Sequence, residues 1–142
     1  MKISFLIDPV TLQSDRDQLR IVLLNLMDNA VSYCNPGGEI AIAARQEHGW
    51  VEVTLRNPAA IDPDRVSHVF DRFWRADAAR TNSGVHCGLG LSLCQKIVQL
   101  LGGSISVQTP DPDIFQILLR LPATNSPLSI APALTSVAAQ PV

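Results

Sequence analysis

Two asparagines four residues apart carry side chains that could bind a metal ion. Asn25 and Asn29 fall in a run of strong helix formers, so a spacing of four places them on one face of a helix, with Tyr33 one turn later. Most neighbouring residues are apolar, so both amides are expected to be partly buried and to need partners. Asn29 offers the hard oxygen ligand that Mg²⁺ prefers. Alternatively, each amide bonds the backbone of a neighbouring strand, and spacing alone does not decide between the two.

The second group with possible chemistry is a glycine-rich turn. Gly84, Gly88 and Gly90 stand immediately before and inside the start of a helix-forming run. Bare backbone lets an anion approach closely, and the free N–H groups and dipole at a helix start favour phosphate. The order differs from a P-loop, since no Lys-Ser or Lys-Thr follows, and no acidic residue follows as in a dinucleotide fingerprint. The turn is therefore either a phosphate site or an ordinary hinge.

The elements that must position these groups alternate between strand-like and helical patterns. Strands are predicted over 3–7, 39–47, 50–55, 104–108 and 114–121, and the two-residue turn at 48–49 makes the second and third antiparallel neighbours. Helices are predicted over 15–33, from 62 to about 73, and over 88–103. Residues 75–87 lack apolar periodicity and are predicted to form a loop. This order indicates one mixed α and β domain.

Length and composition limit the classes of function. With 142 residues and a net charge of −2, the chain fits one domain and lacks the basic field that non-specific nucleic-acid or anionic-membrane binding needs. Its apolar stretches are too short to span a membrane, and its opening residues do not resemble a signal peptide. Three cysteines without paired spacing favour reduced thiols over disulfides or a structural metal. The folded domain is predicted over 1–122, with an uncharged flexible tail over 123–142.

The asparagine helix and the glycine turn together resemble the ATP-binding catalytic domain of bacterial sensor histidine kinases. Those domains belong to a wider ATPase group that includes gyrase and the Hsp90 chaperones. Residues 25–30 look like the N box of the family, residues 71–77 like its F box and residues 88–91 like its G2 box, in the family's order. The resemblance covers about residues 3–122. It implies an α/β (α+β) two-layer sandwich, in which a mixed, mostly antiparallel sheet packs against three helices, with an ATP lid loop.

The resemblance also implies ATP and Mg²⁺ as ligands and gives roles to residues. Asn29 would hold Mg²⁺, Asn25 would line the same pocket, and Tyr33 would lie against the adenine. Phe70 and Phe73 would anchor the base of the lid, although core packing explains them as well. The other nucleotide-binding positions that the resemblance implies are Asn57, Ile61, Arg75, Gly84, Gly88, Leu89, Gly90 and Leu91.

Two positions depart from the family pattern. The G1 box usually supplies an Asp that receives the adenine amino group, but here Asn57 takes its place, followed by Pro58 and two alanines. Its carbonyl can still accept the adenine N–H, without the charge that makes such bonds roughly twice as strong. Ser32 stands where many relatives carry a Lys or Arg that reaches the phosphates. The candidates to replace that charge are Arg72, Arg75 and Arg80.

The residue four before the metal-binding asparagine favours a kinase over an ATPase. ATP-hydrolysing relatives carry a Glu there as general base, a contribution of about 10²–10⁴-fold. Asn25 cannot accept a proton, whereas a neutral imidazole is already a nucleophile. The expected partners are therefore a dimerisation and histidine phosphotransfer domain of the same kinase and a response regulator. Neither nucleic acid nor direct membrane contact is expected. A cytoplasmic location is expected, with inner-membrane anchoring of a longer parent left open.

The histidines of this chain lack the context of a phosphate acceptor. His48 falls in a predicted turn, His68 on the short helix and His86 in the lid, and none precedes an acidic residue on a helical hairpin. Surface roles are expected for all three. An anti-sigma-like or degenerate nucleotide-binding module without kinase activity is the alternative function, and a gyrase-type ATPase the third.

Overall fold

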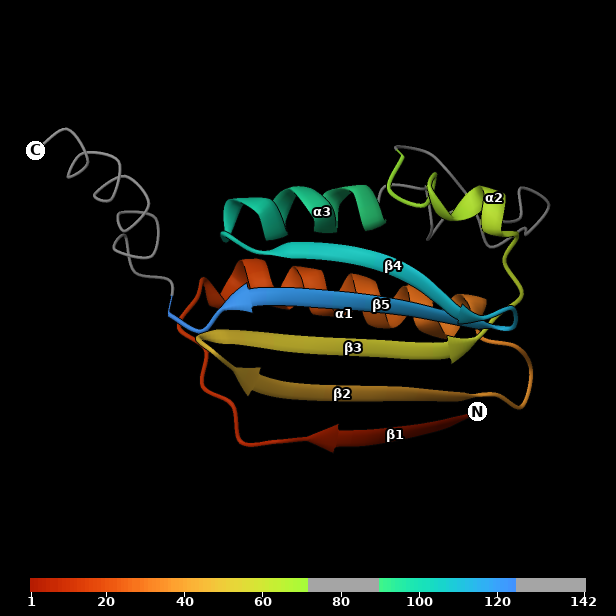
Figure 1. The fold of residues 1–142 in the computed structure, drawn as a ribbon, viewed down its shortest axis with the longest axis horizontal. Coiled ribbons are helices and arrows are strands. Elements are labelled where there is room, and N and C mark those ends of the chain that lie inside the picture. Colours follow the sequence, from red (N-terminus) through yellow and green to blue (C-terminus); the bar gives the residue numbers. More distant parts are fainter. Residues whose placement is uncertain (72–89, 125–142) are drawn as a thin grey trace, which may run out of the picture.

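The fold is a single sheet with its main helices on one face, as the computed structural model of residues 1–71 and 90–124 shows (Figure 1). The elements in chain order are β1 (Lys2–Ile7), α1 (Arg16–Tyr33), β2 (Glu39–Glu47), β3 (Trp50–Pro58), α2 (Pro63–Val66), α3 (Gly90–Leu100), β4 (Ser104–Asp111) and β5 (Ile114–Pro122). The five strands lie in the order β1-β2-β3-β5-β4, with β1 and β2 parallel and all other neighbours antiparallel. The predicted two-layer, mostly antiparallel fold is confirmed.

Helix α1 forms where its sequence predicts and packs one apolar stripe against the sheet. Asp15 caps it, because its carboxylate accepts a hydrogen bond from the Gln18 N–H at 3.0 Å. Its buried stripe is Val22, Leu26 and Ala30. The sheet meets it with alternate residues of the central strands, since β-strand side chains point to opposite faces with a period of two. The buried residues of these strands are Val51, Leu55, Asn57, Phe115, Ile117, Leu119 and Leu121.

Helix α3 completes the helical layer beside α1. Its buried residues include Leu91, Cys94 and Val98. The fully buried Cys94 donates its S–H to the Val22 carbonyl at 3.7 Å, which joins the middles of the two helices. The helix ends at Leu100, and Gly102 just beyond it has a φ of 82°, the left-handed conformation that suits a glycine after a helix end. No helix in the described parts of the chain has both the length and the apolar character to cross a bilayer.

Several predicted boundaries were wrong: β4 ends at Asp111 instead of residue 108 and α3 at Leu100 instead of residue 103, and the ends of β3 and α2 have physical explanations. Strand β3 continues to Pro58 instead of ending at residue 55, because Asn57 and Pro58 pair with Phe115 and Ile114 of β5. Helix α2 ends at Val66 rather than near residue 73. After it, the N–H groups of His68 and Val69 bond carbonyls three residues back, which is the pattern of tight turns. Serine, histidine and β-branched residues in this stretch favour helix weakly, which explains the early end.

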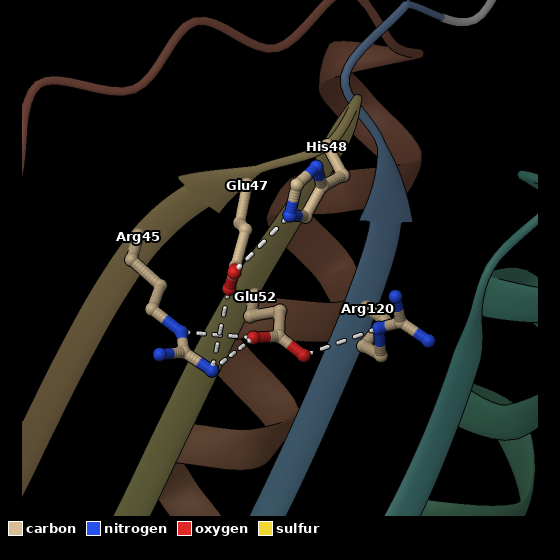
Figure 2. A network of polar contacts seen from close by, with 5 residues as sticks. All are labelled: Arg45, Glu47, His48, Glu52 and Arg120. Atoms are coloured by element: carbon tan, nitrogen blue, oxygen red, sulfur yellow. Dashed lines mark hydrogen bonds and ion pairs between the residues drawn. The ribbon is translucent and has the colours of Figure 1, made fainter.

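The sheet face away from the helices carries a network of charges around Glu52 of β3 (Figure 2). Its carboxylate lies 2.7 Å from Arg45 Nη2 on β2 and 3.2 Å from Arg120 Nε on β5. The second contact is an ion pair without good hydrogen-bond geometry. The Arg120 guanidinium also lies over the Trp50 ring, 4.9 Å from its centroid. The network ties three neighbouring strands together across the exposed face.

The described chain continues slightly past the predicted domain end. Ala123 is buried and its N–H bonds the Gly49 carbonyl at 2.8 Å, and Thr124 forms a bridge to Gln13. The remainder of the predicted tail, residues 125–142, lies outside the described residues, as does the predicted lid loop over 75–87.

Candidate functional site

One flank of α1 carries the predicted amides. Asn25, Asn29 and Tyr33 are each half-buried beside the buried stripe, as their spacing predicted. Asn25 Nδ2 donates to the Ile21 carbonyl at 2.8 Å, so this amide bonds its own helix rather than a strand. A methyl group placed on Gly90 would lie 3.4 Å from Asn25 Oδ1, so the amide oxygen faces the start of α3. The structure therefore brings the asparagine flank and the last glycine of the turn together.

The amino end of α3 provides the second side of the site. Gly90 is the first residue of the helix and Leu91 behind it is buried. The first N–H groups of a helix have no intrahelical partner and form the positive end of its dipole. No acidic side chain occupies the first turn to neutralise that end. A half-buried amide oxygen and a helix start thus face one another.

Asn57 is the buried polar residue at the end of β3. Its side chain is 2% exposed and shares the helix-covered face with Val51 and Leu55. Its Nδ2 atom has no hydrogen-bond partner among the described residues. A buried amide without a partner usually costs about 1–3 kcal/mol, so this donor suits an acceptor supplied by a ligand or water.

The backbone after Asn57 is held from two sides. The Pro58 carbonyl accepts the Asn35 N–H at 2.8 Å, and the Ala59 N–H donates to Asp113 at 3.0 Å. Gly38 makes the first contact possible, since a Cβ there would lie 2.5 Å from Pro58 Cγ. The sequence analysis assigned no role to Gly38 and missed this contact. Its single available signal was the doubled glycine before β2, which a helix stop does not require.

The predicted residues within the described chain gather at one end of the sheet. The end of α1 lies beside the end of β3, because Asn35 bonds Pro58. Figure 1 shows the amino end of α3, the end of β3 and α2 at this same end. Ile61 and Phe70, from the loop before α2 and the turns after it, are half-buried and pack against the core. The site is therefore a corner where α1, β3 and α3 meet.

Comparisons with known proteins agree with this geometry. A family described as histidine kinase-, DNA gyrase B- and HSP90-like ATPases matches residues 14–125, which is most of the chain. The chain belongs to this family. Sensor protein SrrB of Staphylococcus aureus is 38% identical over 109 residues, which are 76% of this chain and 19% of SrrB. The chain thus spans about a fifth of the length of the curated relatives it matches.

Solved structures place the chain with catalytic domains of the family. A mycobacterial sensor histidine kinase, MprB, is 28% identical with a TM-score of 0.76, and the match covers 87% of this chain and 84% of the solved MprB chain. The catalytic domain of histidine kinase ThkA is 26% identical with a TM-score of 0.74, covering 87% and 80%. The chain is therefore homologous to the catalytic ATPase domain of sensor histidine kinases, as its motifs predicted.

Several positions matched to family motifs lie outside the described residues. They are Phe73, Arg75, Gly84, Gly88 and Leu89, together with His86 and the arginines Arg72 and Arg80. Their roles remain predictions. Within residues 1–71 and 90–124, no group of three or more His, Cys, Asp or Glu side chains could hold a metal. Asn29 carries an amide oxygen, which is a hard ligand of the kind that Mg²⁺ prefers.

A hollow of about 760 Å³ lies on the opposite flank of α1, away from the corner that α1, β3 and α3 form. Helical spacing puts Arg20, Leu23 and Met27, which line it, about half a turn away from Asn25 and Asn29. Its walls are largely apolar and include Phe5 and Ile42 from β1 and β2. It lacks the amides and helix start of the site above.

Burial between α1 and α3 keeps the Cys94 thiol uncharged. Complete burial raises the pKa of the Cys94 thiol to about 12, because a thiolate there would be desolvated. The thiol therefore stays protonated and acts as a small apolar group with one weak hydrogen bond. Cys94 supports the spacing of the two helices and has no nucleophilic role.

Proposed function

We propose that this chain binds ATP with Mg²⁺ and transfers the γ-phosphoryl group to a histidine on a separate domain of a sensor histidine kinase. The observation that carries the proposal is the approach of Asn25 Oδ1 on α1 to Gly90 at the amino end of α3. Family membership supports the nucleotide, since the family is one of ATPases. The three sides of the corner suit different parts of a nucleotide bound with Mg²⁺: the amides on α1 suit the metal, the N–H groups at the start of α3 suit phosphate, and the buried Asn57 amide suits the base.

Each residue has a role that follows from its chemistry. The Asn29 oxygen would be the protein ligand of Mg²⁺, while waters and phosphate oxygens complete the octahedron. The amino end of α3 would hold phosphate through its free N–H groups, and Gly90 lets the backbone approach. Asn57 fits the base, because its unpartnered Nδ2 is a buried donor in need of an acceptor. Tyr33 would lie against the adenine ring.

Transfer to histidine suits this site better than hydrolysis. Asn25 cannot take a proton from water, and its Nδ2 is already bonded to Ile21. Bound ATP would supply the γ-phosphoryl group and release ADP as the leaving group, and attack on it by a neutral imidazole needs no strong base. The contribution of this chain is to orient the triphosphate and to stabilise its charge.

The partners and location follow from the family and are part of the proposal. The acceptor would be the dimerisation and histidine phosphotransfer domain of the same kinase, and a response regulator would take the phosphoryl group next. SrrB is called a sensor protein, and this chain covers a fifth of it, so a longer parent would contribute those parts. We place the domain in the cytoplasm, where ATP is available.

Calorimetry with a non-hydrolysable ATP analogue tests the proposal. The wild-type chain should bind the analogue in the presence of Mg²⁺. Asn29→Ala should weaken Mg²⁺-dependent binding at least about tenfold, or about 1.4 kcal/mol, while the circular dichroism spectrum stays unchanged. Gln18→Ala, on the exposed start of the same helix, is the matched control and should bind normally. An unfolded Asn29→Ala variant would indicate a structural amide instead.

One observation favours a second candidate, an interaction module that uses the fold without kinase activity. Asn57 stands where the family usually has an Asp, so the hydrogen bond to the base lacks its charge assistance. Absence of binding at millimolar nucleotide would support this module and end the kinase proposal.

A further inference from the structure

The side-chain amide of Asn57 is buried, but the described residues do not satisfy its hydrogen-bond donor. Its side chain is 2% exposed, and Nδ2 has no hydrogen-bond partner among the described residues. Nearly all buried polar groups in proteins are paired, so a donor buried this deeply indicates an acceptor that arrives with a ligand. Carbonyl and ring-nitrogen acceptors on a base both meet this requirement.

The backbone that carries this amide is fixed, whereas its terminal group can turn over. Pro58 is bonded to Asn35 and Ala59 to Asp113, so the strand end keeps its position. The last torsion of an asparagine is broad and roughly two-fold, which exchanges Oδ1 and Nδ2. Because Nδ2 has no described partner, turning the amide over breaks no described hydrogen bond at that atom.

A carboxamide that can rotate by half a turn can form two hydrogen bonds with either of two base edges, that of adenine or that of hypoxanthine. In one orientation its oxygen accepts from the adenine 6-amino group while Nδ2 donates to ring nitrogen N1. In the other, Nδ2 donates to the 6-oxo group of hypoxanthine while the oxygen accepts from N1–H. A carboxylate is acceptor-only, so on either base it can accept from the single donor, the 6-amino group or N1–H, but it cannot donate to the acceptor beside it.

We propose that Asn57 makes this site accept 6-oxopurine as well as 6-aminopurine nucleoside triphosphates. The inference rests on the proposed function, because it takes the base to lie against Asn57. It predicts that inosine triphosphate, which carries hypoxanthine and no 2-amino group, is a ligand of the wild-type chain.

Calorimetry with Mg²⁺ and three nucleotides tests the inference on the wild-type chain. Inosine triphosphate should bind within about tenfold of ATP, because each base edge finds both of its partners. The analogue 1-deaza-ATP lacks the N1 acceptor, so it should bind at least about fivefold more weakly than ATP.

The possible outcomes distinguish a failure of this inference from a failure of the proposed function on which it rests. If ATP binds and inosine triphosphate binds a hundredfold or more weakly, the inference is wrong and the proposed function stands. Equal affinities for ATP and 1-deaza-ATP would also overturn it, since Nδ2 would then have no contact with N1. If none of the nucleotides binds, the proposed function fails and the inference fails with it.

Discussion

The methyl group that Gly90 lacks would lie 3.4 Å from Asn25 Oδ1, an ordinary contact distance. Gly90→Ala should therefore leave the free energy of unfolding unchanged or raise it by up to about 1 kcal/mol, since alanine suits a helix better than glycine. Nucleotide affinity should fall about tenfold, because the methyl covers the backbone that approaches phosphate. Urea unfolding and calorimetry on the same variant measure the two effects.

Gln99→Ala is the matched control for that substitution. Gln99 is exposed near the other end of α3, so its replacement should change neither quantity appreciably. Gly90→Ala with unchanged nucleotide affinity would show that phosphate does not lie against the start of this helix.

The thiol of Cys94 makes stability depend on pH in the alkaline range. Burial raises its pKa from 9.0 to about 12, so the folded protein resists ionisation that the unfolded chain allows. The stabilisation is complete below about pH 9 and is lost progressively as the pH rises toward 12. Over that range the free energy of unfolding should fall by about 1 kcal/mol per pH unit from this group alone. Urea unfolding between pH 8 and about 10.5 measures the slope.

Other groups also ionise above pH 9, so the comparison with Cys94→Ala isolates the thiol. The variant should be less stable at pH 7, since it loses packing and the 3.7 Å contact with the Val22 carbonyl. Its stability should decline less steeply with pH than that of the wild type. Parallel curves for the two proteins would mean that the thiol is not the source of the slope.

Gly38 joins the turn after α1 to the strand end that carries Asn57. A Cβ at this position would lie 2.5 Å from Pro58 Cγ and 2.9 Å from the Asn35 carbonyl oxygen, so ring and backbone must move. Gly38→Ala should cost about 1–3 kcal/mol of unfolding free energy, as overpacking usually does. It should also weaken nucleotide binding, because Asn57 precedes the displaced proline. Thermal unfolding and calorimetry check the two effects.

The neighbouring glycine provides a sharp control. Gly37 has a φ of 74° and open space around its Cβ position, so Gly37→Ala should cost about 1 kcal/mol through backbone strain alone. Its nucleotide affinity should stay close to that of the wild type. If both variants bind nucleotide normally, the contact between Gly38 and Pro58 does not position the site.

Sequence patterns predicted the elements whose signals are local. Asp15 marked the start of α1, and the two residues between β2 and β3 marked their hairpin. The end of β3 was not predictable, since a proline normally argues against a central strand. Pro58 is tolerated because β2 pairs with β3 only as far as Arg56, so the missing N–H breaks no bond on that side. That pairing is a tertiary property.

The sequence motifs predicted which residues form part of the site, but not how those residues approach one another. The spacing of Asn25 and Asn29 placed both on one half-buried flank of α1, and Gly90 was correctly placed at the start of a helix. Asn25 and Gly90 are far apart in the chain, so their closeness in space could not be predicted from sequence spacing. The same is true of Asn57, whose unpartnered nitrogen depends on the strands and helices that bury it.

The molecule as a whole separates its binding corner from its exposed charges. Asn25, Asn57 and Gly90 lie in the helical layer or beneath it, whereas the charges around Glu52 lie on the open face of the sheet (Figure 2). These ion pairs lie on the sheet face away from that corner, so their loss should leave nucleotide binding unaffected.

Neither described histidine lies on the helical hairpin expected of a phosphate acceptor. His48 lies in the β2–β3 turn, at the opposite end of β3 from Asn57, with its side chain 87% exposed. His68 Nδ1 lies 2.8 Å from Asp71 Oδ2, and no described contact joins this histidine to Asn29 or Gly90. In-line transfer needs the imidazole close to the phosphate in a fixed geometry. The arrangement therefore predicts nucleotide binding without self-phosphorylation.

Incubation of this chain with Mg²⁺ and ATP labelled at the γ-phosphate should leave no acid-labile label on the protein. Calorimetry under the same conditions must detect nucleotide binding, so that a negative result reflects the missing acceptor rather than an empty site. Stable acid-labile label would contradict the prediction, and its loss in His48→Ala, His68→Ala or His86→Ala would identify the acceptor. Label that persists in all three single variants would require a different acceptor or more than one histidine. Label that is acid-stable would instead indicate a serine, threonine or tyrosine, a chemistry that the proposed mechanism does not include.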